Sequence, residues 1–214
     1  MAESESKPKY QICYFKMRAR GEFIRLMFVQ AGEPYIDHFV EVQKWKETVK
    51  PRVPLGHLPV LHYGEHRLAE SIAIGAFLGH ELKLSGGCAI NAGKCLMWAC
   101  GMIDLLNKME PWIKATLIAK DKAKADEAWK SISDYFSDHC RNYTRALERN
   151  ENGWLVGDGL TWADLIVAEI HQRIEEKVDP HALDNHPKLR EHYKRVFELP
   201  NIKKYVAERP ETPF

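Results

Sequence analysis

A proline placed directly before an apolar strand is the most chemically suggestive feature of this 214-residue sequence. In the run Gly56-His57-Leu58-Pro59-Val60-Leu61, Pro59 cannot donate a hydrogen bond to a sheet, and its peptide bond is a candidate for the cis form. Leu58 would then turn its backbone N–H and C=O groups toward solvent or a ligand. An extended peptide could add to those groups as an extra strand. An ordinary proline at a strand start is the commoner interpretation of this spacing alone.

The pair Glu70-Ser71 stands at the opening of an apolar helical segment. Free backbone N–H groups at a helix start and a serine hydroxyl can bind a ligand carboxylate, while Glu70 could meet an ammonium group. A serine that merely caps the helix explains the same pattern. Both interpretations stay open from these two residues.

Two further segments combine an aromatic side chain with cations. Tyr14 ends a predicted strand and is followed by the cationic stretch 16–20, and Trp45 precedes Lys50 and Arg52. A nearby cation favours the anionic form of a phenol or a thiol. Tyrosines that end strands are usually packing residues, so neither segment identifies a function by itself.

The first half of the chain must position these candidates, and it alternates strands with helices. Residues 22–31 predict an apolar-faced helix ended by Gly32, and Ser71 opens a second helix over 72–79. The expected strands span residues 10–15, 36–42, 60–63 and 67–69. The order strand, helix, strand, hairpin, helix predicts a small α/β domain.

The second half of the chain predicts helices only. Residues 90–109 are apolar on more than one side, so this helix must bury two faces, for instance one in the core and one against a partner subunit or in a cleft. Apolar residues between 128 and 147 recur at three- and four-residue steps, which predicts one long amphipathic helix. Thr161 and Asp164 predict a capping box that starts a central helix. Prolines expected at helix boundaries are Pro111, Pro187 and Pro200.

Charge and hydropathy exclude several classes of function. Lys and Arg number 31 against 30 Asp and Glu, a net charge of +1, so no uniform field would hold a nucleic acid. The sequence has no run of about 18 apolar residues, and its start MAESESKPKY has no apolar signal region. We therefore expect a cytoplasmic protein that binds neither nucleic acid nor membrane.

The spacing of cysteine and histidine predicts no metal site. No C-x-x-C or H-E-x-x-H pattern occurs, so we expect free buried thiols and surface histidines. The cysteines are Cys13, Cys88, Cys95, Cys100 and Cys140. The histidines expected at the surface are His38, His62, His66, His80, His139 and His192.

Taken in order, the separated motifs resemble those of the cytosolic glutathione transferases. The matching segments are Tyr14-Phe15, Met17-Arg18-Ala19-Arg20-Gly21-Glu22, Trp45, Gly56-His57-Leu58-Pro59, Glu70-Ser71-Ile72-Ala73, Gly153-Trp154-Leu155-Val156-Gly157-Asp158 and Thr161-Trp162-Ala163-Asp164. The Tyr-Phe-x-x-Arg-x-Arg opening and Asp184-Asn185-His186-Pro187 are similar to the sigma class, which includes haematopoietic prostaglandin D synthase and flatworm enzymes. The ending Arg209-Pro210-Glu211-Thr212-Pro213-Phe214 is similar to the flatworm members.

The resemblance covers about residues 9–214 and implies a fold, a domain division and an assembly. After a flexible tail (1–8), it implies a thioredoxin-like glutathione-binding domain (9–83), a linker (84–89) and an all-helical domain (90–214) that contributes the electrophile pocket. It also implies a homodimer.

The resemblance further implies glutathione as co-substrate, no required metal, and a role for each matching residue. Tyr14 would hydrogen-bond the glutathione sulfur and favour the thiolate, with Arg20 beneath it. Trp45 and Lys50 would hold the glycine end, Leu58 the cysteinyl part, and Ser71 the γ-glutamyl carboxylate. The implied glutathione-binding residues are Tyr14, Arg20, Trp45, Lys50, His57, Leu58, Pro59, Glu70, Ser71 and, where acids of this family lie near the dimer interface, Asp104.

Two residues depart from the family pattern. Ala19 stands where many members have glycine, which could shift the Tyr14 loop, and Glu70 stands where many have glutamine. The electrophile pocket is expected between the domains, lined by Phe15, Met17, Trp112 and Phe214. The leading hypothesis is conjugation of glutathione to hydrophobic electrophiles for detoxification. A prostaglandin D synthase and a non-catalytic, ligand-carrying or crystallin-like protein of the same fold are the alternatives.

Overall fold

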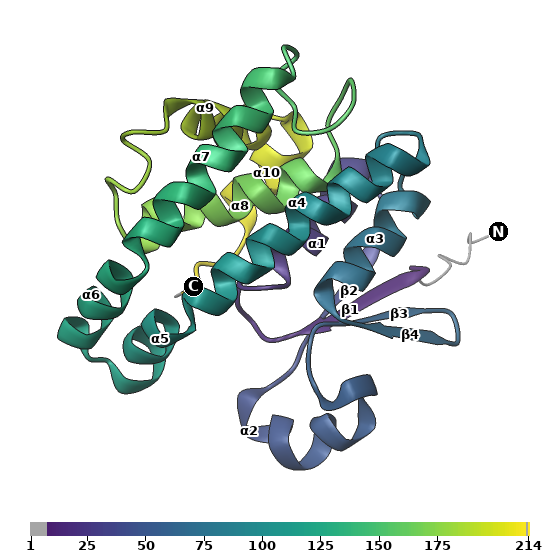
Figure 1. The fold of residues 1–214 in the computed structure, drawn as a ribbon. Coiled ribbons are helices and arrows are strands. Elements are labelled where there is room, and N and C mark those ends of the chain that lie inside the picture. Colours follow the sequence, from purple (N-terminus) through teal and green to yellow (C-terminus); the bar gives the residue numbers. More distant parts are fainter. Residues whose placement is uncertain (1–7, 213) are drawn as a thin grey trace.

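The computed structural model describes residues 8–212 and residue 214, so the expected tail 1–8 lies almost wholly outside the described residues. The N-terminal part forms a four-stranded sheet in the order β2-β1-β3-β4 (Figure 1). Its strands are β1 (Tyr10–Tyr14), β2 (Tyr35–Phe39), β3 (Val60–Tyr63) and β4 (His66–Ala69). Strands β1 and β2 run parallel, and β3 runs antiparallel to β1 and β4. The predicted strands at 10–15, 60–63 and 67–69 are confirmed to within one residue at an end.

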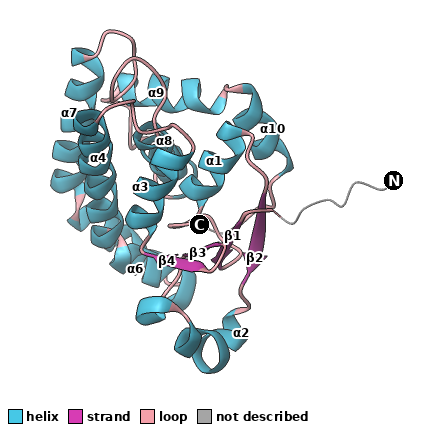
Figure 2. Cartoon of the chain, turned by 90° about the vertical axis from the view of Figure 1, so that its right-hand side faces the viewer, coloured by secondary structure: helices cyan, strands magenta, loops and turns pink. Residues whose placement is uncertain are grey.

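The helices α1 (Glu22–Ala31) and α3 (Ser71–Glu81) cover one face of the sheet, and the segment around α2 (Val42–Lys44) lies on the other side (Figure 2). Helix α1 ends at Gly32, whose φ of 66° is the left-handed conformation that glycine adopts without steric cost. The strand predicted for 36–42 ends earlier, at Phe39. Among the described residues the only strand beside β2 is β1, and their pairing stops where Tyr14 meets Phe39.

After α2 the chain continues in short helical turns at Trp45–Val49, Lys50–Arg52 and Pro54–Gly56 before it enters β3. None of these turns was expected from the sequence. They carry the residues from Trp45 to Gly56 past the end of the sheet, below the strands in Figure 1.

The rest of the chain is helical and packs around α8 (Trp162–Lys177), which lies between the other helices (Figure 1). The other helices are α4 (Ala89–Lys108), α5 (Glu110–Ile113), α6 (Lys122–Ser131), α7 (Ser133–Arg149), α9 (Pro187–Phe197) and α10 (Pro200–Glu208), with one π-helical turn at Lys114–Ala119. The expected α/β part followed by an all-helical part is therefore confirmed. Pro187 and Pro200 stand first in their helices, as predicted.

The single long helix predicted across 128–147 is wrong. The chain forms α6 and α7, which are separated at Ile132, where φ and ψ are −106° and 8°. The apolar period continues across the break because Ala125, Phe136 and Cys140 all face the same core. Periodicity therefore located the buried face and missed the bend.

The capping box at the start of α8 is confirmed, and it is more extensive than the motif alone implies. The fully buried Asp164 accepts hydrogen bonds from the N–H and hydroxyl of Thr161, both at 2.8 Å, and from the N–H of Leu155 at 2.8 Å. Nε2 of His192 on α9 lies 2.9 Å from the same carboxylate. One carboxylate thus ties together the helix start, the preceding loop and α9.

Two glycines of α3 allow the sheet part and the helical part to pack closely. A Cβ atom on Gly75 would lie 2.7 Å from Cζ3 of Trp162, and one on Gly79 would lie 2.6 Å from Cδ1 of the same ring. Both distances are shorter than real Cβ contacts allow. The indole of Trp162, 1% exposed, therefore fits against α3 because residues 75 and 79 have no side chain.

The predictions for cysteine and histidine exposure are correct only in part. The five cysteines are free, but Cys88 and Cys100 are exposed, whereas Cys13, Cys95 and Cys140 are buried. His139 and His192 are buried rather than at the surface. His139 lies on the core face of α7, which the apolar period of that helix already marked.

Helix α4 is long and apolar enough to cross a membrane by length and composition, although the sequence analysis expected no span. Core helices of soluble proteins pass the same test. About 28% of its most apolar window is buried within the chain, and Ile90 and Met97 are 68% and 53% exposed. One apolar face of α4 is therefore uncovered in the single chain.

Candidate active site

The sheet topology brings the separated sequence motifs to one end of the sheet. Strand β1 ends at Tyr14, one residue beyond the pair Cys13–Val60. Pro59 immediately precedes Val60, which pairs in turn with Ala69, the last residue of β4. Residue 14 ends β1, residues 58–59 precede β3 and residues 70–71 follow β4. All of them therefore lie at the same end of three adjacent strands. Their juxtaposition follows from strand direction and register.

Tyr14 is buried, with 5% of its surface exposed, and its hydroxyl oxygen accepts a hydrogen bond from the loop that follows β1. The backbone N–H of Arg20 donates to Oη of Tyr14 at 3.2 Å. Burial raises the pKa of the phenol, while this hydrogen bond and the charges of Arg173, Arg20 and Arg25 act in the opposite direction. The phenol therefore keeps its proton at neutral pH. Because its oxygen already accepts from Arg20, the O–H is free to donate to an anion.

Arg20 contacts Tyr14 through its main chain, not through its guanidinium. Its Nη2 atom donates to Oδ1 of Asn107 on α4 at 2.6 Å. The expected guanidinium beneath the tyrosine is therefore replaced by a peptide N–H, and the side chain bridges to the helical part instead. The guanidinium carbon of Arg25 lies 6.0 Å from the centroid of the Tyr14 ring.

The peptide bond between Leu58 and Pro59 is cis, as the proline before the strand suggested. Leu58 and Pro59 are both buried at the start of β3. The neighbouring His57 is exposed, and its Nδ1 lies 3.4 Å from Oε1 of Glu70. The two segments at this edge are thus in direct contact through their side chains.

Glu70 has a backbone conformation that side-chain-bearing residues rarely adopt. Its φ is 70° and its ψ is 114°, immediately before α3 begins at Ser71. Such a conformation costs on the order of 1–3 kcal/mol and tends to occur at binding sites. Ser71 is 4% exposed, and the Glu70 carboxylate is about half exposed. The turn presents the first N–H groups of α3 beside a carboxylate.

Trp45 and Lys50 lie in the helical turns beyond the end of β2. Trp45 is half-buried, and its ring meets that of Phe15 edge to face, with centroids 5.6 Å apart. Lys50 is exposed and runs along Gly56, where a Cβ atom would lie 3.6 Å from its Cε. Both residues therefore lie on the segment that leads to Leu58 and Pro59.

A cavity of about 270 Å³ lies between the Tyr14 loop and the helical part. Its walls come from residues on both sides, namely Ala19, Arg20, Leu106, Asn107, Glu110, Ile113 and Phe214. Of the four residues predicted to line such a pocket, Phe214 does so. Trp112 is buried and packs against Phe214, with the two ring centroids 5.4 Å apart.

Phe15 and Met17 do not line this cavity, contrary to expectation. The ring of Phe15 packs between those of Tyr14 and Trp45, with centroid distances of 5.9 Å and 5.6 Å. Met17 faces a separate small cavity of about 70 Å³ beside Arg25 and Asp37. Tyr205 and Arg209 of the helical part line that cavity as well. The carbonyl of Met17 accepts a hydrogen bond from Nη1 of Arg25 at 2.9 Å.

Asp104 lies on the exposed side of α4. Among the residues that the structure describes, it makes no hydrogen bond with the other candidate site residues. A contribution of Asp104 across an interface between two chains remains the prediction.

Sequence reasoning missed three residues that contact the Tyr14 loop, namely Arg25, Asn107 and Arg173. Arg173 is the clearest omission: it is fully buried, and its Nη1 donates to the carbonyl of Ala19 at 3.0 Å. A signal for burial was available, because Glu169 and Arg173 are oppositely charged residues four positions apart beside the apolar stripe of Ile166, Ile170 and Ile174.

Comparison with known proteins identifies the family. The family model described as "Glutathione S-transferase, C-terminal domain" matches residues 107–209. The chain is 32% identical over 208 residues to "Probable glutathione S-transferase 8" of Caenorhabditis elegans, covering 96% of this chain and 98% of that protein. The chain belongs to the glutathione S-transferase family.

Solved structures agree with this family membership. Na-GST-3, described as a monomeric glutathione S-transferase of the hookworm Necator americanus, is 29% identical with a TM-score of 0.89, covering 96% of this chain and 99% of that chain. Rat hPGDS in complex with a quinoline is 25% identical with a TM-score of 0.83, covering 97% and 100%. The predictions of a glutathione transferase and of its fold are confirmed, and glutathione is the co-substrate that this family uses.

Proposed function

We propose that this transferase is a cytoplasmic enzyme of sigma type that conjugates reduced glutathione to hydrophobic electrophiles, with Tyr14 donating a hydrogen bond to the glutathione thiolate. The observation that carries the proposal is that Tyr14, Leu58-Pro59 and Glu70-Ser71 lie at the same end of the sheet. Glutathione would lie at this end of the sheet, with its cysteinyl part paired to the main chain of Leu58 as an added strand. Its glycine end would point toward Trp45 and Lys50, and its γ-glutamyl end toward Glu70 and Ser71.

The proposed reaction balances without a cofactor. The thiol proton leaves to solvent, the thiolate attacks an electrophilic carbon to form a C–S bond, and a leaving group such as halide departs with its electron pair. Lowering a thiol pKa from ~8.5 to ~6.5 raises the thiolate fraction at pH 7 about 25-fold, but reduces nucleophilicity about 8-fold. The net gain of ~3-fold is small. Most of the acceleration would come from holding sulfur and electrophile together, with the electrophile in the cavity beside Arg20 and Phe214.

The proposal keeps the predicted domain division and assembly. Residues 9–83 would bind glutathione, residues 84–89 would link the domains, and residues 90–214 would supply the electrophile pocket. The uncovered apolar face of α4, with Ile90 and Met97 exposed, supports a homodimer in which Asp104 lies near the interface. Because one similar structure is described as monomeric, sedimentation equilibrium of the purified chain is the direct measurement.

Replacing the phenol oxygen tests the role of Tyr14. We expect Tyr14→Phe to raise the pKa of the bound glutathione thiol and to lower the turnover of an aryl halide at saturating glutathione. Tyr10→Phe is the matched control, because Tyr10 is a buried tyrosine of the same strand whose hydroxyl bonds Glu81 instead. Unchanged turnover and an unchanged thiol pKa in Tyr14→Phe would refute the proposed role.

A second candidate function is isomerisation of a prostaglandin endoperoxide. The similarity to rat hPGDS favours it over other reactions of the family. The thiolate would attack one peroxide oxygen, forming an S–O bond as the O–O bond breaks and the other oxygen leaves as an alkoxide that takes up a proton. Loss of a proton from the carbon that bears the sulfur-bound oxygen would then form the ketone and break the S–O bond, which releases the glutathione thiolate. Incubation with the endoperoxide and identification of the product separates this activity from conjugation.

A non-catalytic glutathione-binding protein of the same fold is the third possibility. The presence of Tyr14, Arg20, Trp45 and Ser71 argues against it, because a carrier does not need a group that stabilises a thiolate. A chain that binds to glutathione-agarose but conjugates no electrophile would support the carrier instead.

A further inference from the structure

The loop that carries the N–H donor to Tyr14 has an unfavourable backbone conformation. Ala19 has a φ of 32°, in the left-handed region where glycine is the favoured residue. The next N–H along the chain is that of Arg20, which donates to Oη of Tyr14. The direction of this N–H therefore depends on how the peptide between Ala19 and Arg20 is held.

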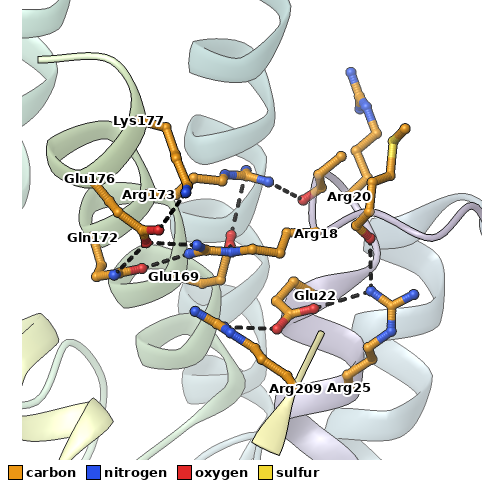
Figure 3. Close-up of polar contacts among 12 residues, drawn as sticks. Arg18, Arg20, Glu22, Arg25, Glu169, Gln172, Arg173, Glu176, Lys177 and Arg209 are labelled. Atoms are coloured by element: carbon orange, nitrogen blue, oxygen red, sulfur yellow. Dashed lines mark hydrogen bonds and ion pairs between the residues drawn. The ribbon is translucent and has the colours of Figure 1, made fainter. Parts of the chain in front are cut away.

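One side chain of the helical part holds this peptide directly. Nη1 of Arg173, on α8, donates to the Ala19 carbonyl at 3.0 Å (Figure 3). Because that carbonyl and the Arg20 N–H belong to one peptide plane, fixing the oxygen also fixes the N–H on the opposite side. Arg173 is fully buried, so water cannot replace this hydrogen bond easily.

We propose that Arg173 is a positioning residue for thiolate stabilisation: it holds the Ala19–Arg20 peptide so that the Arg20 N–H supports Tyr14, and it offsets the cost of an alanine at residue 19. The inference rests on the proposed role of Tyr14. It explains why this chain tolerates alanine at a backbone conformation suited to glycine.

The surroundings of Arg173 keep its guanidinium in place. Nη2 lies 3.4 Å from Oε2 of Glu169, and the guanidinium carbon lies 4.3 Å from the ring centroid of Phe214. The other carboxylate oxygen of Glu169 accepts from Nε of Arg18 at 3.0 Å. Nε and Nη2 of Arg173 find no hydrogen-bond partner among the described residues, so the Ala19 carbonyl is the acceptor that orients the guanidinium.

Charge supports the same role. The titratable and charged groups that act on Arg173 are Glu169 on its own helix, Arg18 and Tyr14 from the loop and strand, and Glu22 on α1. Its positive charge lowers the pKa of Tyr14, which strengthens the phenol as a hydrogen-bond donor. Removal of this charge should therefore weaken thiolate stabilisation as well as loosen the loop.

The test is a double-mutant cycle of Arg173→Met and Ala19→Gly, with conjugation of an aryl halide as readout. We expect Arg173→Met to lower kcat/KM by roughly 10-fold and to move the midpoint of its pH profile upward by about 0.5, with little change in the KM for glutathione. Adding Ala19→Gly should restore kcat/KM by at least about 3-fold, because glycine adopts this conformation without help. The matched control is Arg190→Met, which removes a guanidinium on α9 that pairs with Glu175 of α8. It should change neither kcat/KM nor the midpoint of the pH profile.

The outcomes separate this inference from the proposed function. Wild-type kcat/KM and pH midpoint in Arg173→Met, or no restoration by Ala19→Gly, would overturn the positioning role. If Arg173→Met does not fold, Arg173→Gln takes its place in the same cycle with the same expectations, because glutamine also removes the charge and shortens the side chain that reaches the Ala19 carbonyl. Tyr14→Phe is measured alongside: if it leaves the thiol pKa unchanged, the proposed role of Tyr14 fails, whereas an effect of Tyr14→Phe without one of Arg173→Met contradicts only the present inference.

Discussion

Gly21 lies so close to Tyr14 that a Cβ atom at residue 21 would be 2.5 Å from Cδ1 of the tyrosine ring. The φ of Gly21 is −96°, so the backbone itself would accept alanine. Glycine is therefore required at residue 21 because a side chain would clash with the tyrosine ring, not because of the backbone conformation. The absence of a side chain allows the loop to pass directly against the phenol that it supports.

Gly21→Ala should displace the Tyr14 ring and reduce activity. Overpacking of a dense site costs roughly 1–3 kcal/mol, and about 1.4 kcal/mol of misplacement in the transition state is a 10-fold loss of kcat/KM. Steady-state conjugation of an aryl halide measures the effect. Gly159→Ala is the control, since a Cβ atom there meets nothing within 4 Å. Equal activity of the two variants would contradict the steric argument.

Gly79→Ala should destabilise the protein although alanine is the better helix former. Helix propensity alone favours alanine by up to ~1 kcal/mol, but the new Cβ atom would lie 2.6 Å from Cδ1 of Trp162. Because overpacking typically costs about 1–3 kcal/mol, we expect a net loss of free energy of unfolding in a urea titration. Adding Trp162→Phe should make the loss smaller than the sum of the two single losses. Simple additivity would show that the two residues do not conflict.

Local patterns predicted the elements of the fold better than their ends. Helix α1, strand β3 and the capping box at Thr161 follow from nearest neighbours in sequence, and they are found where expected. The end of β2 depends on where its partner β1 stops, and the break at Ile132 depends on how α6 and α7 pack. Neither is encoded in the spacing of apolar residues.

The candidate site was predictable as a set of segments but not as a network. The directions of the strands place Tyr14, Leu58 and Ser71 at one end of the sheet, so the sequence motifs were enough to find them. Arg173 reaches the Tyr14 loop across 154 residues of sequence. The local pattern could mark Arg173 as a buried charge, but it could not name the Ala19 carbonyl as its partner. The guanidinium of Arg20 was misplaced for the same reason, because its partner Asn107 belongs to the other part of the chain.

Glu70→Ala should weaken glutathione binding without changing the chemical step. The carboxylate lies at the proposed γ-glutamyl end, and loss of a charged hydrogen bond to an ammonium group costs about 1.5–3 kcal/mol. We expect the KM for glutathione to rise roughly 10-fold or more while kcat stays within about 2-fold. Glu65→Ala, in the exposed turn between β3 and β4, is the control. A fall in kcat at unchanged KM would place Glu70 in the chemical step instead.

Two buried histidines should make the stability of the fold sensitive to acid. His139 on α7 and His171 on α8 face each other, with ring centroids 5.6 Å apart, and Tyr143 packs against both. Neither ring nitrogen of His171 finds a hydrogen-bond partner among the described residues. Burial lowers the pKa of His139 to about 4 and the pKa of His171 well below its usual value, with the neighbouring histidine adding to the latter effect.

The sign of the expected pH dependence follows from these two lowered pKa values. Above about pH 6.5 both rings are neutral in the folded and the unfolded chain, so they add no pH dependence. As the pH falls below that value, the unfolded chain binds protons that the folded chain does not, and the folded state loses about 1.4 kcal/mol per pH unit for each histidine. For His139 the loss continues until the pH approaches about 4.

Urea titrations at about pH 7 and about pH 5 measure this loss. His139→Phe and His171→Leu should each reduce the difference between the two free energies of unfolding, and the double variant should reduce it further. Any cost of repacking would appear at both pH values and cancel from the difference. His80→Gln, at the exposed end of α3, should leave the difference unchanged. If the double variant retained the full pH dependence of the parent, the acid sensitivity would have to come from other groups, because these two rings would then be protonated equally in both states.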